Sequence, residues 1–198
     1  MTTSALVSRR AFLSAAVGLV AGTALVHAPT DALADQRAEA FVASIGNSVL
    51  AAARAASESQ FRAIMRKSAD IPTIANYTLG RYRSRLQPNQ RKEFYSLFEN
   101  YIARVFVSNA SKIAGTSLKI TGSQARSDSV IVSSEVEFGG GRPPMPVLWR
   151  LVKSGGGYKI FDISVQGVWL AGLTQQSFVS VVSKNNGDIT SLISFLRQ

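Results

Sequence analysis

The spacing of apolar residues changes twice along the chain. From residue 36 to about residue 113 apolar side chains recur every three or four positions, and from 118 to 165 they alternate every second position. Beyond Phe178 the helical spacing returns. The first spacing predicts amphipathic helices and the second predicts half-buried strands. Helices, then strands, then helices predict an α+β fold: a curved antiparallel sheet of about four strands wrapped by helices.

The first helical part divides into four segments. We expect helices over 36–59, 59–68, 71–79 and 88–113. Pro72 suits a first helical turn, and Gly80 ends or kinks the third helix. In the fourth, a broad apolar stripe follows the helical period and must be buried; it comprises Phe94, Leu97, Phe98, Tyr101, Ile102, Val105 and Phe106. Near the C-terminus, Asp188 is placed to cap a last helix.

The strands are expected over 118–121, 129–138, 145–153 and 158–165, with short Gly-rich connections that make neighbours antiparallel. In the last of these strands, alternation puts Phe161 and Ile163 on an apolar face and Asp162 on a wetter face. Three consecutive apolar residues, 168–170, then break the pattern. They mark the edge of a core, the end of a cleft, or the lip of a cavity.

The N-terminal segment is expected to be a targeting signal rather than part of the fold. Arg9-Arg10 precedes 16 uncharged residues, Ala11 to Val26, and Ala32-Leu33-Ala34 offers small residues where a signal peptidase cuts. We expect residues 1–34 to be a twin-arginine-type export signal cleaved after Ala34, with a cut after Ala28 as the alternative. The uncharged stretch is shorter than the ~20 apolar residues of a membrane span. Residues 35–198 then form a single domain.

Composition removes several kinds of chemistry from that domain. The chain has no Cys and a single His, His27, which lies in the signal. Residues 35–198 therefore contain no Ser-His-Asp triad, no Cys nucleophile and no His or Cys metal site. Their 20 basic and 11 acidic residues give a net charge of +9, which favours an anionic surface as partner or serves only solubility. Export and the absence of a basic motif interleaved with aromatics argue against nucleic acid.

Two kinds of site remain open from the residues alone. Asp162 with a tyrosine is a candidate proton-transfer pair for a small isomerase or lyase, although a mid-strand Asp is more often a hydrogen-bonded structural residue. The chain also has more large apolar side chains than one helix-on-sheet interface needs, and the surplus predicts an apolar cavity. No credible phosphate loop, metal site or cofactor site is present in the sequence.

Three stretches resemble the MlaC family of periplasmic phospholipid-binding (toluene-tolerance) proteins: residues 70–106, residues 141–170 and residues 187–198. The recognisable pieces are Leu79-Gly80, the helix start at Pro88-x-Gln90, the Gly-Arg-Pro-Pro turn and the strand that leads to Gly167-Val168. The resemblance also extends to a hopanoid-associated branch. The sequence departs from the family pattern at Gln166 and Trp169, and a bulky Trp169 is expected to narrow the pocket or change its ligand.

The resemblance implies a cystatin- or NTF2-like fold and no enzymatic activity. It implies a periplasmic carrier that holds phospholipid acyl chains and shuttles lipid between an outer-membrane lipoprotein complex and an inner-membrane ABC transporter, with transient membrane-surface contact. A hopanoid or other lipid is the alternative ligand, and a docking module without ligand is a further alternative. The predicted pocket residues are Tyr77, Phe94, Phe98, Tyr101, Val105, Val132, Val136, Val147, Trp149, Leu151, Ile163, Val165, Val168 and Trp169. Arg81, Arg83 and Arg85 are predicted to contact the head group or an acidic partner, or else to form a solvated loop.

Overall fold

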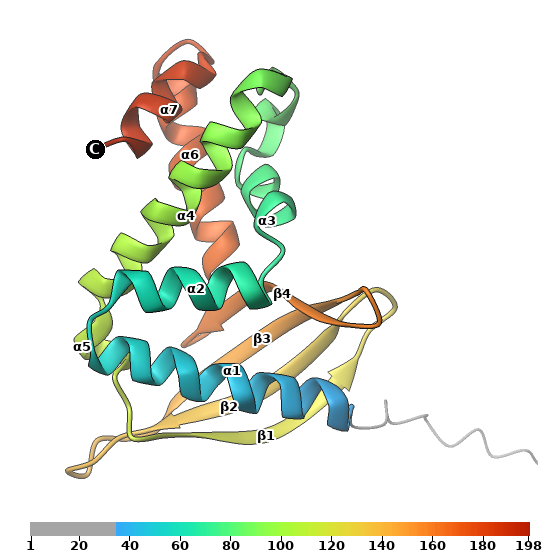
Figure 1. Ribbon diagram of the computed structural model, residues 1–198, viewed down its shortest axis with the longest axis vertical. Helices are drawn as coiled ribbons and strands as arrows, with labels where there is room; N and C mark the ends of the chain where they lie inside the picture. Colours follow the sequence, from blue (N-terminus) through green and yellow to red (C-terminus); the bar gives the residue numbers. More distant parts are fainter. Residues whose placement is uncertain (1–34) are drawn as a thin grey trace, which may run out of the picture. The chain divides into compact units, whose positions relative to one another are not determined.

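The computed structural model describes residues 35–198 (Figure 1), and the predicted export signal, residues 1–34, lies outside the described residues. The helices are α1 (Gln36–Arg54), α2 (Glu58–Ser68), α3 (Ile71–Thr78), α4 (Arg91–Ser108), α5 (Ala110–Ile113), α6 (Leu170–Lys184) and α7 (Ile189–Leu196), with short 3-10 helices η1 (Gly80–Arg85) and η2 (Pro88–Gln90). The strands are β1 (Ser117–Ala125), β2 (Val130–Glu137), β3 (Met145–Ser154), β4 (Gly157–Val165) and β5 (Val168–Trp169). None of the helices in this described part is long and apolar enough to cross a membrane.

The sheet is an antiparallel meander in the order β1-β2-β3-β4-β5. Helix α1 lies along one face of it, and α3, α4, α6 and α7 stand together beyond the β4 side, with α2 between α1 and α4 (Figure 1). This confirms the predicted α+β class with helices packed on a curved sheet. The fifth strand is an addition to the predicted four: β5 is only two residues long, too short to show an alternating pattern.

Helix boundaries differ from the prediction where capping decides them. The first helix stops at Arg54 rather than residue 59, because Ala56 has a positive φ and the Ser57 side chain caps α2. The long helix is divided into η2, α4 and α5, with Asn109 donating its side-chain NH₂ to the Val105 carbonyl at the break. Gly80 does follow the end of α3, with φ +51°, in the left-handed region that glycine adopts readily.

The faces of β4 differ from simple alternation. Arg150 pairs with Asp162 but Leu151 pairs with Ile160, so Phe161 is an extra residue that bulges out of the ladder. Ile160 therefore joins the inner face with Leu151, while Asp162 lies on the opposite face with Arg150. The predicted wet face is wrong, because the start of α6 covers Asp162 and leaves it 6% exposed.

Three apolar cores hold the fold. The helical bundle packs Phe94, Phe98 and Phe178 together, the sheet packs Val132, Trp149 and their neighbours under α1, and a smaller core surrounds Phe106. Phe61 of α2 stacks on Phe106 with ring centroids 3.7 Å apart. The three cores meet where α2 passes between the sheet and the bundle, and their side chains do not fill that junction.

Candidate functional site

An apolar cavity of about 130 Å³ lies at the junction of the three cores. Seven of the elements already described contribute its wall, which comprises Ile45, Val49, Phe61, Ile64, Met65, Ser68, Ile74, Thr78, Phe98, Ile102, Trp149, Ile160, Phe161, Asp162, Ile163, Leu170, Ala171 and Thr174, with Ala69 from the α2–α3 link. Leu170 both lines the cavity and is 41% exposed. The cavity therefore opens to solvent beside the first turn of α6.

The hydroxyl groups in this wall are satisfied within their own helices. Ser68 donates to the Ile64 carbonyl (2.6 Å), Thr78 to the Ala75 carbonyl (2.7 Å) and Thr174 to the Leu170 carbonyl (2.8 Å). The indole N–H of Trp149 donates to the Ser134 hydroxyl at 2.8 Å. Because these groups already have partners, they make few demands on a ligand, and the wall behaves as an apolar surface.

Asp162 is the only charged group among the lining residues. Its Oδ1 accepts from the backbone N–H of Ile163 (2.8 Å) and of Ala171 (2.9 Å), the second residue of α6. A strand residue thus caps a helix that begins eight positions later in the chain. Burial raises the pKa of the Asp162 carboxyl above its ordinary value, while the two N–H donors and the Arg150 charge act in the opposite direction.

Two elements that carry the cavity are joined by an ion pair. The Arg66 Nε lies 2.7 Å from Oε1 of Glu99, which is 7% exposed. This pair links α2 to α4, two of the helices that line the cavity. Its charged atoms are not among those that line the cavity, so they position the wall without contacting its contents.

The structure brings only part of the predicted pocket together. Phe98, Trp149 and Ile163 line the cavity. The other predicted residues do not line it. Phe94 and Tyr101 lie in the bundle core, and Val132, Val136, Val147, Leu151 and Val165 lie in the core under α1. Tyr77, Val105 and Val168 are exposed.

Trp169 also lies outside the cavity wall, contrary to the expectation that it narrows the pocket. Its ring stacks under the guanidinium of Arg150 at 4.3 Å, and its neighbours Leu170 and Ala171 contribute the wall instead. The wall residues that sequence reasoning missed include all those contributed by α1, α2, α3 and α6. Ile45 and Val49 of α1, and Phe61, Ile64 and Met65 of α2, belong to apolar stripes, but a stripe does not tell a filled interface from an unfilled one.

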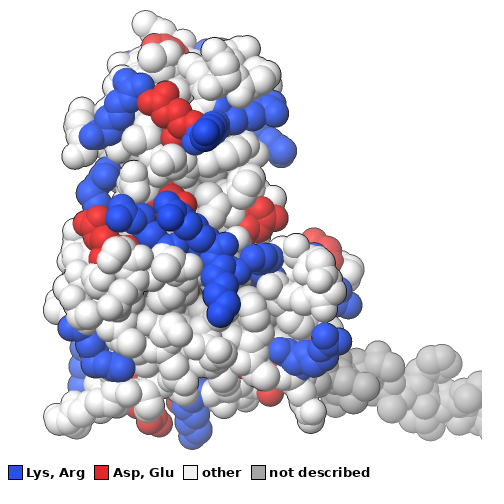
Figure 2. All heavy atoms as spheres, viewed as in Figure 1, with Lys and Arg blue, Asp and Glu red and all other residues white. Residues whose placement is uncertain are grey.

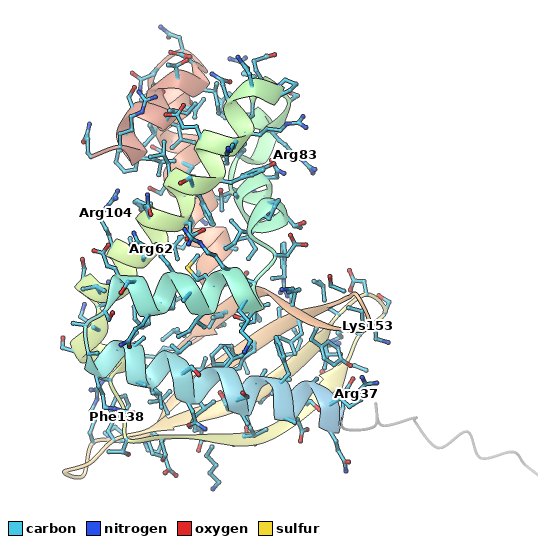
Figure 3. The ribbon with its side chains drawn as sticks, viewed as in Figure 1. Arg37, Arg62, Arg83, Arg104, Phe138 and Lys153 are labelled. Carbon is cyan, nitrogen blue, oxygen red and sulfur yellow. The ribbon has the colours of Figure 1, made fainter. Side chains whose placement is uncertain are left out.

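The predicted arginine triplet divides into two environments. Arg81 and Arg83 join Arg91, Asn76 and Ser84 around a recess on the helical end of the molecule; Figure 3 labels Arg83 there, at the end remote from Arg37 and Lys153. Arg85 instead donates to the Gly187 carbonyl at 2.5 Å and ties η1 to the turn before α7. Among residues 35–198, no carboxylate is paired with the three recess arginines.

The fold and the cavity define a small α+β protein built around one apolar pocket. Residues 36–198 match the family model described as MlaC protein, and the chain belongs to the MlaC family. A solved structure of a phospholipid-binding protein from Ralstonia solanacearum, in complex with a phospholipid, matches with a TM-score of 0.68 and 23% sequence identity. The match covers 81% of this chain and 94% of that one. No curated protein matches the sequence.

These findings confirm the predicted family and fold class. At this identity, the structural likeness establishes the fold alone. Within residues 35–198, no group of three or more acidic or His side chains is placed to hold a metal ion.

Proposed function

We propose that the protein is a periplasmic lipid carrier that holds phospholipid acyl chains in the cavity and catalyses no reaction. The observation that carries the proposal is the wall itself: it is apolar, and its hydroxyls and indole N–H are already bonded within the protein. Membership of the MlaC family supports the proposal, as does the phospholipid in the complex of the Ralstonia protein. The export signal predicted in residues 1–34 supports the location.

The energetics suit a carrier. Burying an acyl chain stabilises it by ~0.8 kcal/mol per methylene relative to water, but by almost nothing relative to a bilayer. Such a protein therefore keeps lipid out of water while leaving it free to return to a membrane. The cavity of about 130 Å³ is smaller than the ~300–1,000 Å³ typical of ligand pockets. Holding whole acyl chains requires the helices around it to move apart.

Purification from the envelope provides the direct test. We expect protein recovered from the periplasm, extracted with organic solvent and analysed by mass spectrometry, to release about one phospholipid per chain. Release of a hopanoid or another lipid would support a lipid carrier but with a different ligand. Protein that is folded but lacks lipid would overturn the proposal and favour a docking module. Turnover of a small substrate that disappears in Asp162→Asn would favour the isomerase or lyase alternative.

The arginine recess is the proposed contact for phosphate head groups or for an acidic partner in the outer-membrane lipoprotein complex or the inner-membrane ABC transporter. Arginine pairs well with phosphate and carboxylate oxygens. Figure 2 shows that basic side chains outnumber acidic ones on the face drawn, in keeping with transient contact with anionic membrane surfaces. None of the residues around the recess lines the cavity, so the recess serves encounter rather than retention of the acyl chains.

Removing charge from the recess should slow delivery. We expect the double variant Arg83→Gln/Arg91→Gln to retain its bound lipid but to transfer it to anionic vesicles several-fold more slowly at low salt, because opposite charge speeds encounter. Fluorescent-lipid transfer measured against ionic strength checks this. Arg126→Gln, in the β1–β2 turn, is the matched control. Equal transfer rates for wild type, the double variant and Arg126→Gln would show that the recess takes no part in lipid transfer.

A further inference from the structure

Residue 35 is held by three elements at once. The Asp35 carboxylate caps α1, with Oδ1 accepting from the Ala38 N–H at 2.9 Å, and it accepts a short hydrogen bond from the Tyr158 hydroxyl of β4. The backbone N–H of Asp35 donates to the Ser123 hydroxyl of β1 at 2.7 Å. Ser123 in turn donates to Oε1 of Glu39 at 2.7 Å. The backbone nitrogen of this single residue is therefore linked through a hydroxyl to a carboxylate.

A β-bulge creates this arrangement. Ile120 pairs with Ser134 but Gly122 pairs with Ser133, so Thr121 is an extra residue in β1. Side chains alternate between faces, and the extra residue reverses the alternation beyond it. Ser123 therefore shares the inner face with its partner Val132, under α1. Without the bulge, Ser123 would point away from Asp35.

The acceptors in this cluster outnumber the protons that the backbone amide of Asp35 can donate. An amide N–H has one proton to donate, and Ser123 takes it. The Glu39 carboxylate accepts from the same Ser123 hydroxyl that accepts from this nitrogen, and the Asp35 carboxylate belongs to the same residue. Among the described residues, no ion pair to Lys or Arg neutralises either carboxylate. The hydrogen bond from Tyr158 lowers the pKa of the Asp35 carboxyl, which keeps that group ionised near neutral pH.

We propose that this cluster is the binding site for the protein's own α-ammonium group, created when a signal peptidase hydrolyses the Ala34–Asp35 bond. Water adds across the peptide bond, the C–N bond breaks, Ala34 leaves with the new carboxylate and Asp35 retains the nitrogen as an ammonium. The ammonium keeps the Ser123 acceptor and gains protons that Glu39 and Asp35 accept. Processing at this bond then stabilises the domain, whether or not lipid is bound.

The charges around the site set its pH dependence. The groups that face it are Glu39 and Arg37 of α1, the Asp35 carboxylate itself, Lys153 of β3 and Tyr158 of β4; β1 contributes only the neutral Ser123. Figure 3 shows Arg37 and Lys153 at this end of the domain. These two cations and the positive end of the α1 dipole oppose the ammonium. The Glu39 carboxylate, linked to the nitrogen through Ser123, and the Asp35 carboxylate favour the charged ammonium.

The first test is the position of the cut. Full-length protein is expressed in a Gram-negative host, recovered from the periplasm and examined by intact mass and N-terminal sequencing. We expect Asp35 as the first residue. A mature chain that begins at Pro29, or that retains residues 1–34, would overturn the proposal.

The second test measures coupling between the terminus and Glu39. Two chains are compared, one that begins at Asp35 and one that begins at Pro29, which restores a neutral amide at Asp35. We expect Glu39→Gln to lower the melting temperature of the Asp35 chain by about 2–4 °C more than that of the Pro29 chain at pH 6–7, which corresponds to about 1 kcal/mol. This difference should vanish above about pH 9–10, as the ammonium loses its proton.

Glu58→Gln is the matched control, because Glu58 also lies in the first turn of its helix but does not contact residue 35. It should affect both chains equally. Ser123→Ala repeats the measurement from the other side of the site. If Glu39→Gln and Ser123→Ala each lower the melting temperature equally in the two chains, the cluster does not bind the α-ammonium group and the proposal is wrong.

Discussion

Ile64→Glu is expected to abolish lipid binding while leaving the domain folded. Ile64 lies on α2, is only partly buried, and lines the cavity. Glutamate suits a helix, but its carboxylate would have no partner in the apolar wall. An unpaired charge against an acyl chain is unfavourable by several kcal/mol, and each 1.4 kcal/mol corresponds to a factor of ten in affinity. We expect the lipid that copurifies to fall at least tenfold, measured by extraction and mass spectrometry.

Val105→Glu provides the matched control. It is also a β-branched residue on a helix, in α4, but it is 42% exposed and does not line the cavity. This variant should keep its full complement of lipid. Circular dichroism and thermal melting establish that both variants fold. A folded Ile64→Glu protein with normal lipid content would place the ligand elsewhere.

Asp162→Ala is expected to produce the largest loss of stability. The substitution removes the acceptor for two backbone N–H groups, those of Ile163 and Ala171, and detaches the start of α6 from β4. A buried donor without a partner costs about 1–3 kcal/mol. We therefore expect the free energy of unfolding to fall by about 2–4 kcal/mol and the melting temperature by about 5–12 °C. Chemical denaturation provides the measurement.

Asp162→Asn separates the cap from the charge. Asparagine retains the Oδ1 acceptor but removes the buried negative charge, so it should be at least as stable as wild type at neutral pH. Because burial raises the pKa of the Asp162 carboxyl, the folded state holds the proton more tightly than the unfolded chain. The stability that this group contributes is fully present when the pH is below 3.8, the pKa of the carboxyl in the unfolded chain. It is lost as the pH rises through the higher pKa of the folded state.

Wild type should therefore lose stability relative to Asp162→Asn as the pH rises from below 3.8 through the raised pKa of the folded state. Denaturation curves of the two proteins over that range provide the comparison. If the free energy of unfolding of wild type instead rises relative to that of the asparagine variant as the pH rises, the fold stabilises the carboxylate as an anion. In that case the N–H donors and Arg150 outweigh burial.

The sequence was most informative about elements with strong local signals. Pro72 and Gly80 marked α3, Asp188 marked the last helix, and alternation located the four long strands. Local signals failed where one residue reverses the pattern. The bulge at Phe161 moved Ile160 to the inner face of β4, and the two-residue strand β5 left no periodic trace. Of the predicted pocket residues, Phe98, Trp149 and Ile163 line the cavity, whereas Val132 and others belong to filled interfaces.

The sequence by itself determined the order and type of the elements, the absence of His and Cys chemistry in residues 35–198, and the resemblance that the family model confirms. These follow from residue identity and from spacing over a few turns. Only the tertiary structure decided where the cavity lies, that Asp162 caps α6, and that Asp35 meets Ser123. The physical reason is that a cavity is space that the side chains of adjoining cores leave unfilled. Its position depends on how elements far apart in the chain pack, which local periodicity does not encode.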